Sequence, residues 1–120
     1  MNGNSLRVAL REGTRDLHER LDAAAGPLAD LASYRRYLTA TFAFRAALEP
    51  ALAGAGALTG WPPVLLVPVL RRDVSDLGIT PPVPPDPPIL HGMDEIFGAL
   101  YVAEGSALGA RLVWARAQVL

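Results

Sequence analysis

Three glycines lie on one face of the last helix predicted for this chain, and they limit what can pack against that face. Residues 93–120 contain no proline and carry apolar side chains at helical spacing. Gly98, Gly105 and Gly109 are separated by seven and four residues, which places them within roughly 40° of each other around a helix. Each interior glycine costs about 1 kcal/mol relative to alanine. The strip therefore indicates either tight packing against another helix or a helix that lies across a planar ligand.

The composition indicates one small domain over residues 1–120. The net charge of −1 gives no electrostatic reason to expect nucleic acid or an anionic membrane surface as a partner. The chain has no cysteine, which excludes disulfides, thiolate catalysis and cysteine-ligated metals. The longest apolar run is too short to span a bilayer, and the first residues do not resemble a signal peptide. We therefore expect a cytoplasmic location and no membrane partner.

Helix signals dominate the first half of the chain, so we expect an all-α fold. A first helix is predicted from a cap at Ser5 to about Ala25, where Gly26 ends it. Ser33 is a second cap candidate, and a second helix is predicted over residues 34–52.

The second half is predicted to contain two more helices. Residues 54–63 are expected to form a loop. A third helix is predicted over residues 64–77, with Gly78 as its stop. The proline-rich residues 80–88 must then be extended, as a stiff connector or as a motif that a partner recognises. The glycine-containing helix over residues 93–120 follows.

One flank of the first helix carries side chains suited to ligand binding. We expect a buried stripe of leucines beside it, formed by Leu6, Leu10, Leu17 and Leu21. His18 falls at the edge of this stripe, and Arg11, Arg15 and Asp22 share its flank. The structural interpretation is an ordinary boundary histidine. The functional interpretation is an imidazole that binds a metal, with Asp22 orienting the ring and the arginines meeting carboxylates of the same ligand.

Together the two helices carry the features expected of haem bound between them, and their residues resemble those of a known family. LREGTRDLH, residues 10–18, resembles the proximal-helix motif of the haem oxygenases, and GALYVAEGSALG, residues 98–109, resembles their distal helix. The similarity is greatest to the bacterial biliverdin-producing members that serve bacteriophytochromes. Residues 33–38 and 70–78 also match in order and spacing. The resemblance implies an all-α, haem-oxygenase-like helical bundle.

The resemblance implies a role for each matching residue. His18 matches the proximal iron ligand and is therefore the expected metal-binding residue. Arg11 and Arg15 match basic positions that contact the haem propionates. Gly105 and Gly109 match the distal glycines whose backbone flanks bound O2, so both are expected in haem binding and in catalysis.

Two positions depart from the family pattern. Ser106 stands where better-known members carry an aspartate that holds a water network for oxygen activation, and it takes that catalytic place here. A hydroxyl is a poorer hydrogen-bond acceptor than a carboxylate, which affects the expected route of proton delivery. Glu104 is near in sequence but lies about 100° away around the helix. Ala110 replaces the second glycine of the family's distal pair.

The expected function is O2-dependent opening of haem to biliverdin with release of iron and CO. Haem is both substrate and cofactor, and electrons are expected from a separate ferredoxin or reductase because the chain has no flavin or dinucleotide fingerprint. A bacteriophytochrome is the expected acceptor of biliverdin. The alternatives are a non-catalytic haem- or bilin-binding module, a structural helical interaction domain, and another enzyme on the same superfamily fold, such as a thiaminase-like protein.

Members of the family continue beyond the distal helix, so this chain is expected to be incomplete relative to them, with the C-terminal helices missing. The sequence leaves three explanations open. The chain is a fragment, or association replaces the missing helices, or the protein is a remnant.

Overall fold

The computed structural model describes residues 3–118, and side-chain surroundings are described for these residues except 108–113 and 116–117. Regular structure in this part of the chain is entirely α-helical, which confirms the predicted all-α class. The helices are α1 (Gly3–Ala25), α2 (Leu31–Ala51), α3 (Ala55–Thr59), α4 (Val67–Asp76) and α5 (Met93–Ala117). None of the described helices combines the length and the hydropathy that crossing a membrane requires.

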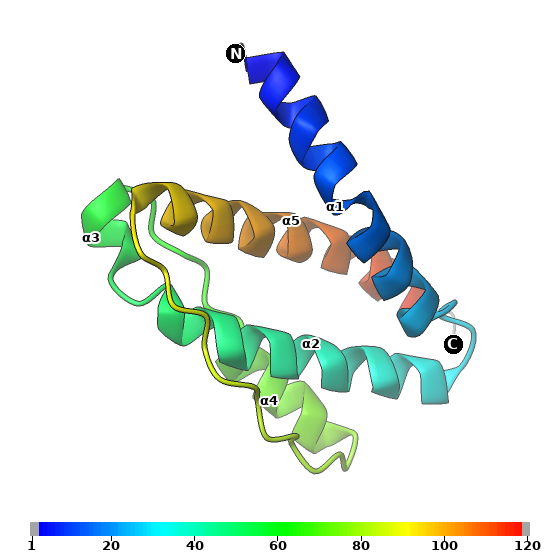
Figure 1. The fold of residues 1–120 in the computed structure, drawn as a ribbon. Helices are drawn as coiled ribbons and strands as arrows, with labels where there is room; N and C mark the ends of the chain where they lie inside the picture. Colours follow the sequence, from blue (N-terminus) through cyan, green and yellow to red (C-terminus); the bar gives the residue numbers. More distant parts are fainter. Residues whose placement is uncertain (1–2, 119–120) are drawn as a thin grey trace.

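The core is built around α2, which has neighbours on two sides (Figure 1). Toward α4, Leu38 and Phe42 bury Val74. The guanidinium of Arg71 lies over the Phe42 ring, 5.2 Å from its centroid, and adds a cation–π contact to this side. The second cluster joins the end of α2 to α3 and α5 and consists of Leu48, Leu52, Ala55, Leu100 and Ala103. α2 therefore holds the two halves of the molecule together.

The start of α2 differs from the prediction by three residues. Asp30, not Ser33, is the N-cap, and its Oδ1 accepts a hydrogen bond of 2.8 Å from the Ser33 amide. The Ser33 hydroxyl oxygen in turn accepts from the Asp30 amide at 3.0 Å, which completes a reciprocal capping box. These bonds from the Ser33 backbone and hydroxyl lower the pKa of Asp30. Asp and Ser both cap helices, and the reciprocal bonds between Asp30 and Ser33 make Asp30, the earlier of the two, the N-cap of α2.

The segment expected as a loop over residues 54–63 contains the short helix α3. Ala55 is buried there against the second core cluster. Helical propensity alone does not form a helix of this length, because nucleation is unfavourable. Contact with α5 stabilises it, and that contact connects segments far apart in the sequence.

The predicted third helix begins three residues later than expected, at Val67, and ends one residue earlier, at Asp76. Its first turn is set by the side chain of Glu49, whose carboxylate accepts the amides of Leu66 and Val67 at 2.9 and 3.1 Å. At the other end Gly78 takes a left-handed φ of 67°, which glycine adopts without steric cost. Its amide donates to Ser75 while the next amide donates to Val74, the paired bonds of a Schellman motif.

The N-terminal part of α1 projects away from the other helices (Figure 1), and α1 buries none of its residues. The four leucines predicted to form a buried stripe are 51–65% exposed, so that prediction is wrong. The amphipathic pattern identified an apolar face, but no described helix covers it. Ser5 lies inside α1 rather than at its cap, because the helix already includes Gly3. The predicted end at Ala25 is confirmed, with Gly26 at a φ of 65°.

Candidate functional site

The three predicted haem-binding residues of α1 lie exposed on one flank of the helix. Arg15 forms an ion pair with Glu12, with Nη2 and Oε1 2.7 Å apart and both side chains more than half exposed. Such a pair contributes little to stability, which leaves Arg15 free to exchange its partner. Arg11 and His18 form no hydrogen bond or ion pair with any residue the structure describes, so the predicted orientation of His18 by Asp22 is not observed.

The glycine strip of α5 faces away from the core. A Cβ atom added at Gly98 or Gly105 would meet no atom within 4 Å, whereas one at Gly56 in α3 would lie 3.1 Å from Pro62. The interpretation of the strip as tight packing against another helix is therefore wrong for Gly98 and Gly105 in the part of the chain that the structure describes. Gly109 belongs to α5, but its surroundings lie outside the described residues. Ser106 follows Gly105 and is half-buried.

An aromatic hollow of about 300 Å³ adjoins the glycine strip. It is lined by Trp61, Phe97, Leu100, Tyr101 and Glu104. Tyr101 lies within about 40° of Gly105 around α5, so the hollow and the strip form one continuous surface. These aromatic residues were not among the site residues predicted from the sequence. The available signal was the i, i+4 spacing of Phe97 and Tyr101 on a helix flank that bears glycine.

Neither of the two hollows found among the described residues is shared by α1 and α5. The aromatic hollow contains no residue of α1. A second, more open hollow of about 530 Å³ runs along α2 beside Ile79 and Pro82, and it also contains no residue of α1. Each helix thus presents its own set of candidate residues to solvent.

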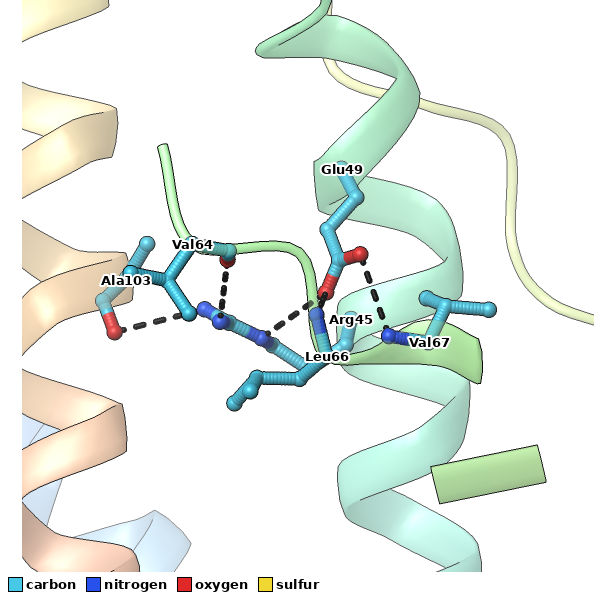
Figure 2. A network of polar contacts seen from close by, with 6 residues as sticks. All are labelled: Arg45, Glu49, Val64, Leu66, Val67 and Ala103. Carbon is cyan, nitrogen blue, oxygen red and sulfur yellow. Dashed lines mark hydrogen bonds and ion pairs between the residues drawn. The ribbon is translucent and has the colours of Figure 1, made fainter. Parts of the chain in front are cut away.

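A buried ion pair, also not predicted from the sequence, connects α2 to three other segments (Figure 2). The side chains of Arg45 and Glu49 are 1% and 7% exposed, and Arg45 Nε lies 3.1 Å from Glu49 Oε2. That N–H makes no hydrogen bond, so the contact is an ion pair only. Arg45 also donates to the carbonyl oxygens of Val64 at 3.1 Å and Ala103 at 3.3 Å.

The pair could have been suspected from its spacing. Arg45 lies among the apolar residues of the second helix, and Glu49 follows it by one turn. A charged residue on an apolar face is expected to have a partner, because burying an unpaired charge is costly. The carbonyl and amide groups that complete the network come from distant segments and leave no local signal.

Comparison of the chain with protein-family models, curated proteins and solved structures gave no match. Among the described residues, no three His, Asp or Glu side chains are grouped so that they could hold a metal ion. The chemistry of the exposed flank of α1 and the open strip of α5 remains the basis for assigning a function.

Proposed function

We propose that this chain is a haem-binding domain of the haem oxygenase type, which opens haem to biliverdin with release of iron and CO. The observation that carries the proposal is the open glycine strip of α5. Among the described residues, no atom lies within 4 Å of a Cβ added at Gly98 or Gly105, and both glycines lie beside exposed aromatic side chains. Interior glycines destabilise a helix, and packing does not explain those of α5. Their open backbone fits contact with a flat ligand.

The side chains present fit haem as a ligand. Histidine is an ordinary axial ligand of haem iron, and the porphyrin brings its own nitrogen donors. A single exposed His18 is therefore sufficient, whereas a metal ion without porphyrin would require a cluster that the described residues do not form. The guanidinium groups of Arg11 and Arg15 share the flank of His18 and suit the two carboxylates of haem.

On the other side of the ligand, the proposed role of α5 is steric. Gly98 and Gly105 offer backbone without side chains, so the helix can approach the ring closely. Gly105 and Gly109 would leave room for O2 and direct it toward one carbon of the ring. The hydroxyl of Ser106 can accept and donate one hydrogen bond to water near this point.

Haem is the substrate in this proposal, and it supplies the redox chemistry while bound. The chain holds the ligand through His18, orients its carboxylates through Arg11 and Arg15, and restricts access along α5. Electrons must be delivered by a separate ferredoxin or reductase. A cytoplasmic location is part of the same proposal, and the family resemblance adds a bacteriophytochrome as the acceptor of biliverdin.

The second candidate is a non-catalytic haem- or bilin-binding module. It is favoured by Ser106, which replaces an aspartate of the family pattern and is half-buried. The residues that would hold the ligand are the same in both candidates. They differ only in whether bound haem is converted.

Hemin titration of the purified chain tests the proposal. We expect a Soret band with the features of a histidine ligand, loss of those features in His18→Ala, and partial recovery with added imidazole. His91→Ala is the matched control, since His91 is the other histidine of the chain and is also exposed. An unchanged spectrum in His18→Ala, or no binding by the wild type, would contradict the proposal.

Turnover with a reductant separates the enzyme from the carrier. In Gly105→Ala the added methyl group meets no protein atom, so folding should be retained. If Gly105 lies over the ring, the ferric spectrum should be kept while the yield of biliverdin falls. A wild type that binds hemin but forms no biliverdin with ascorbate or a reductase supports the non-catalytic module.

A further inference from the structure

The buried Arg45–Glu49 pair has no place in the proposed reaction, yet it holds the helix that carries the glycine strip. Removing two charges from water costs several kcal/mol per ion, and well-packed apolar side chains often replace such pairs without loss of stability. Arg45 Nε also remains without a hydrogen bond. Stability alone is therefore a weak explanation for this pair.

The directional bonds of Arg45 reach both segments that face α2 on this side. One terminal nitrogen donates to Val64 in the segment before α4, and the other donates to Ala103 within α5 (Figure 2). Glu49 completes the unit by accepting the first amides of α4. The rigid guanidinium of Arg45 thus fixes the positions of α5 and of the start of α4 relative to the same point on α2.

The bond to Ala103 also relates the core to the glycine strip. Ala103 is buried, and Gly105 follows two residues later on a face about 160° away. A hydrogen bond that holds the Ala103 carbonyl against α2 therefore limits both the sliding and the rotation of α5. Apolar contacts in this cluster are non-directional and resist these motions less.

We propose that Arg45, held by Glu49, is a positioning residue. It fixes the position of α5 along its axis and its rotation relative to α2, and it thereby orients the glycine strip toward the ligand. The effect on the ligand rests on the proposed function. The tether between α2 and α5 does not, and it can be measured without haem.

The informative variant is Arg45→Met combined with Glu49→Gln. It removes both charges together, so no buried ion is left unpaired, and the glutamine oxygen can still accept an amide at the start of α4. Arg35→Met is the matched control. Arg35 also lies on α2 and donates to a main-chain carbonyl, but that carbonyl belongs to Leu77 at the end of α4.

Hydrogen exchange of the ligand-free proteins measures the tether. In the double variant we expect amides of α5 around Ala103 to exchange about tenfold faster or more, because a hydrogen bond from a charged donor shifts an equilibrium by at least that factor. Exchange in the part of α2 that faces α4 should be unchanged. Arg35→Met should show the reverse pattern, with faster exchange at the end of α4 and none of the effect in α5.

The ligand-bound protein measures the consequence for the strip. With haem and a reductant, the double variant should form a broader mixture of biliverdin isomers per haem converted, and Arg35→Met should keep the wild-type isomer ratio. A loss of stability alone would lower the amount of bound haem without changing this ratio.

Exchange in α5 equal to wild type, or increased equally in both variants, would overturn the proposal. An isomer ratio unchanged in the double variant would also overturn it. If the wild type binds no hemin, the proposed function fails, while the exchange comparison still decides whether Arg45 tethers α5. Should the double variant not fold, Arg45→Lys serves instead. It keeps the charge with fewer donors, and the tether predicts faster exchange in α5 with folding retained.

Discussion

Helices α1 and α2 are of similar length, but α1 is exposed to solvent whereas α2 is packed in the core. α1 spans 23 residues and buries none, whereas α2 spans 21 residues and buries seven. The separation of apolar and polar faces is nevertheless sharper in α1. α2 has packing partners on two sides, so apolar residues occur around much of its circumference and blur the pattern. A clear amphipathic pattern therefore shows that a helix has an apolar face, while burial depends on what covers that face.

The two helices also divide the roles proposed for this chain. Substitutions in α2 should act on stability, because its side chains form the core and the buried ion pair. Substitutions in α1 should act on ligand binding, because His18, Arg11 and Arg15 contribute nothing to the described packing. Four measurements test this division.

The largest effect is expected from Arg45→Met alone. This change leaves the Glu49 carboxylate buried without its cation, and breaking a buried pair in this way typically costs about 3–5 kcal/mol of unfolding free energy. Arg11→Met in α1 should change it by less than about 0.5 kcal/mol. Urea unfolding of both variants gives the comparison. Equal losses from the two arginines would show that α1 is part of the cooperative core.

A leucine in each helix gives the next contrast. Leu38 is buried between α2 and α4, so Leu38→Ala should destabilise the fold by about 2–5 kcal/mol. Leu17 in α1 is 61% exposed, and Leu17→Ala should cost less than about 0.5 kcal/mol. Thermal unfolding followed by circular dichroism measures both. A large loss in Leu17→Ala would mean that the leucine stripe of α1 is covered in solution.

Binding of hemin should reduce the difference in hydrogen-exchange protection between α1 and α2. If α1 supplies the iron ligand, saturation at 100 times the dissociation constant adds about 2.7 kcal/mol of stability. Hydrogen exchange in α1 should then slow, and the same addition to His18→Ala should slow it much less. Protection that appears only in α2 and α4 would place the ligand elsewhere, against the proposal.

The smallest effect concerns the junction between the two helices, where Asp30 caps α2. Its pKa is lowered by the bonds from Ser33, so the folded state binds this proton less readily than the unfolded state. The contribution is present above the unfolded-state pKa of about 3.9 and is lost as the pH falls through the lower folded-state value. Asp30→Asn keeps a side-chain oxygen that can cap the helix but removes the titrating group. The melting temperature of this variant should therefore fall less steeply as the pH is lowered through the acid range. Identical acid profiles for the two proteins would argue against the cap.

Some parts of the molecule were predictable because their signals are local. The helical period placed His18, Arg11 and Arg15 on one flank of α1 and Gly98 and Gly105 on one face of α5. Gly26 and Gly78 ended helices as expected, since each adopts a left-handed conformation that other residues avoid. The start of α2 was misplaced because Asp30 and Ser33 are both capping residues and their reciprocal bonds are a property of the folded turn.

The sequence by itself determined the all-α class, two helix ends and the residues that share each helix face, because these depend on neighbours within a few positions along the chain. The tertiary structure alone decided that α1 stands exposed, that α3 is helical, that Glu49 sets the start of α4, and that Arg45 reaches Ala103. Each of these depends on contacts between segments distant in sequence. A pattern within one helix cannot specify which distant segment, if any, will cover it.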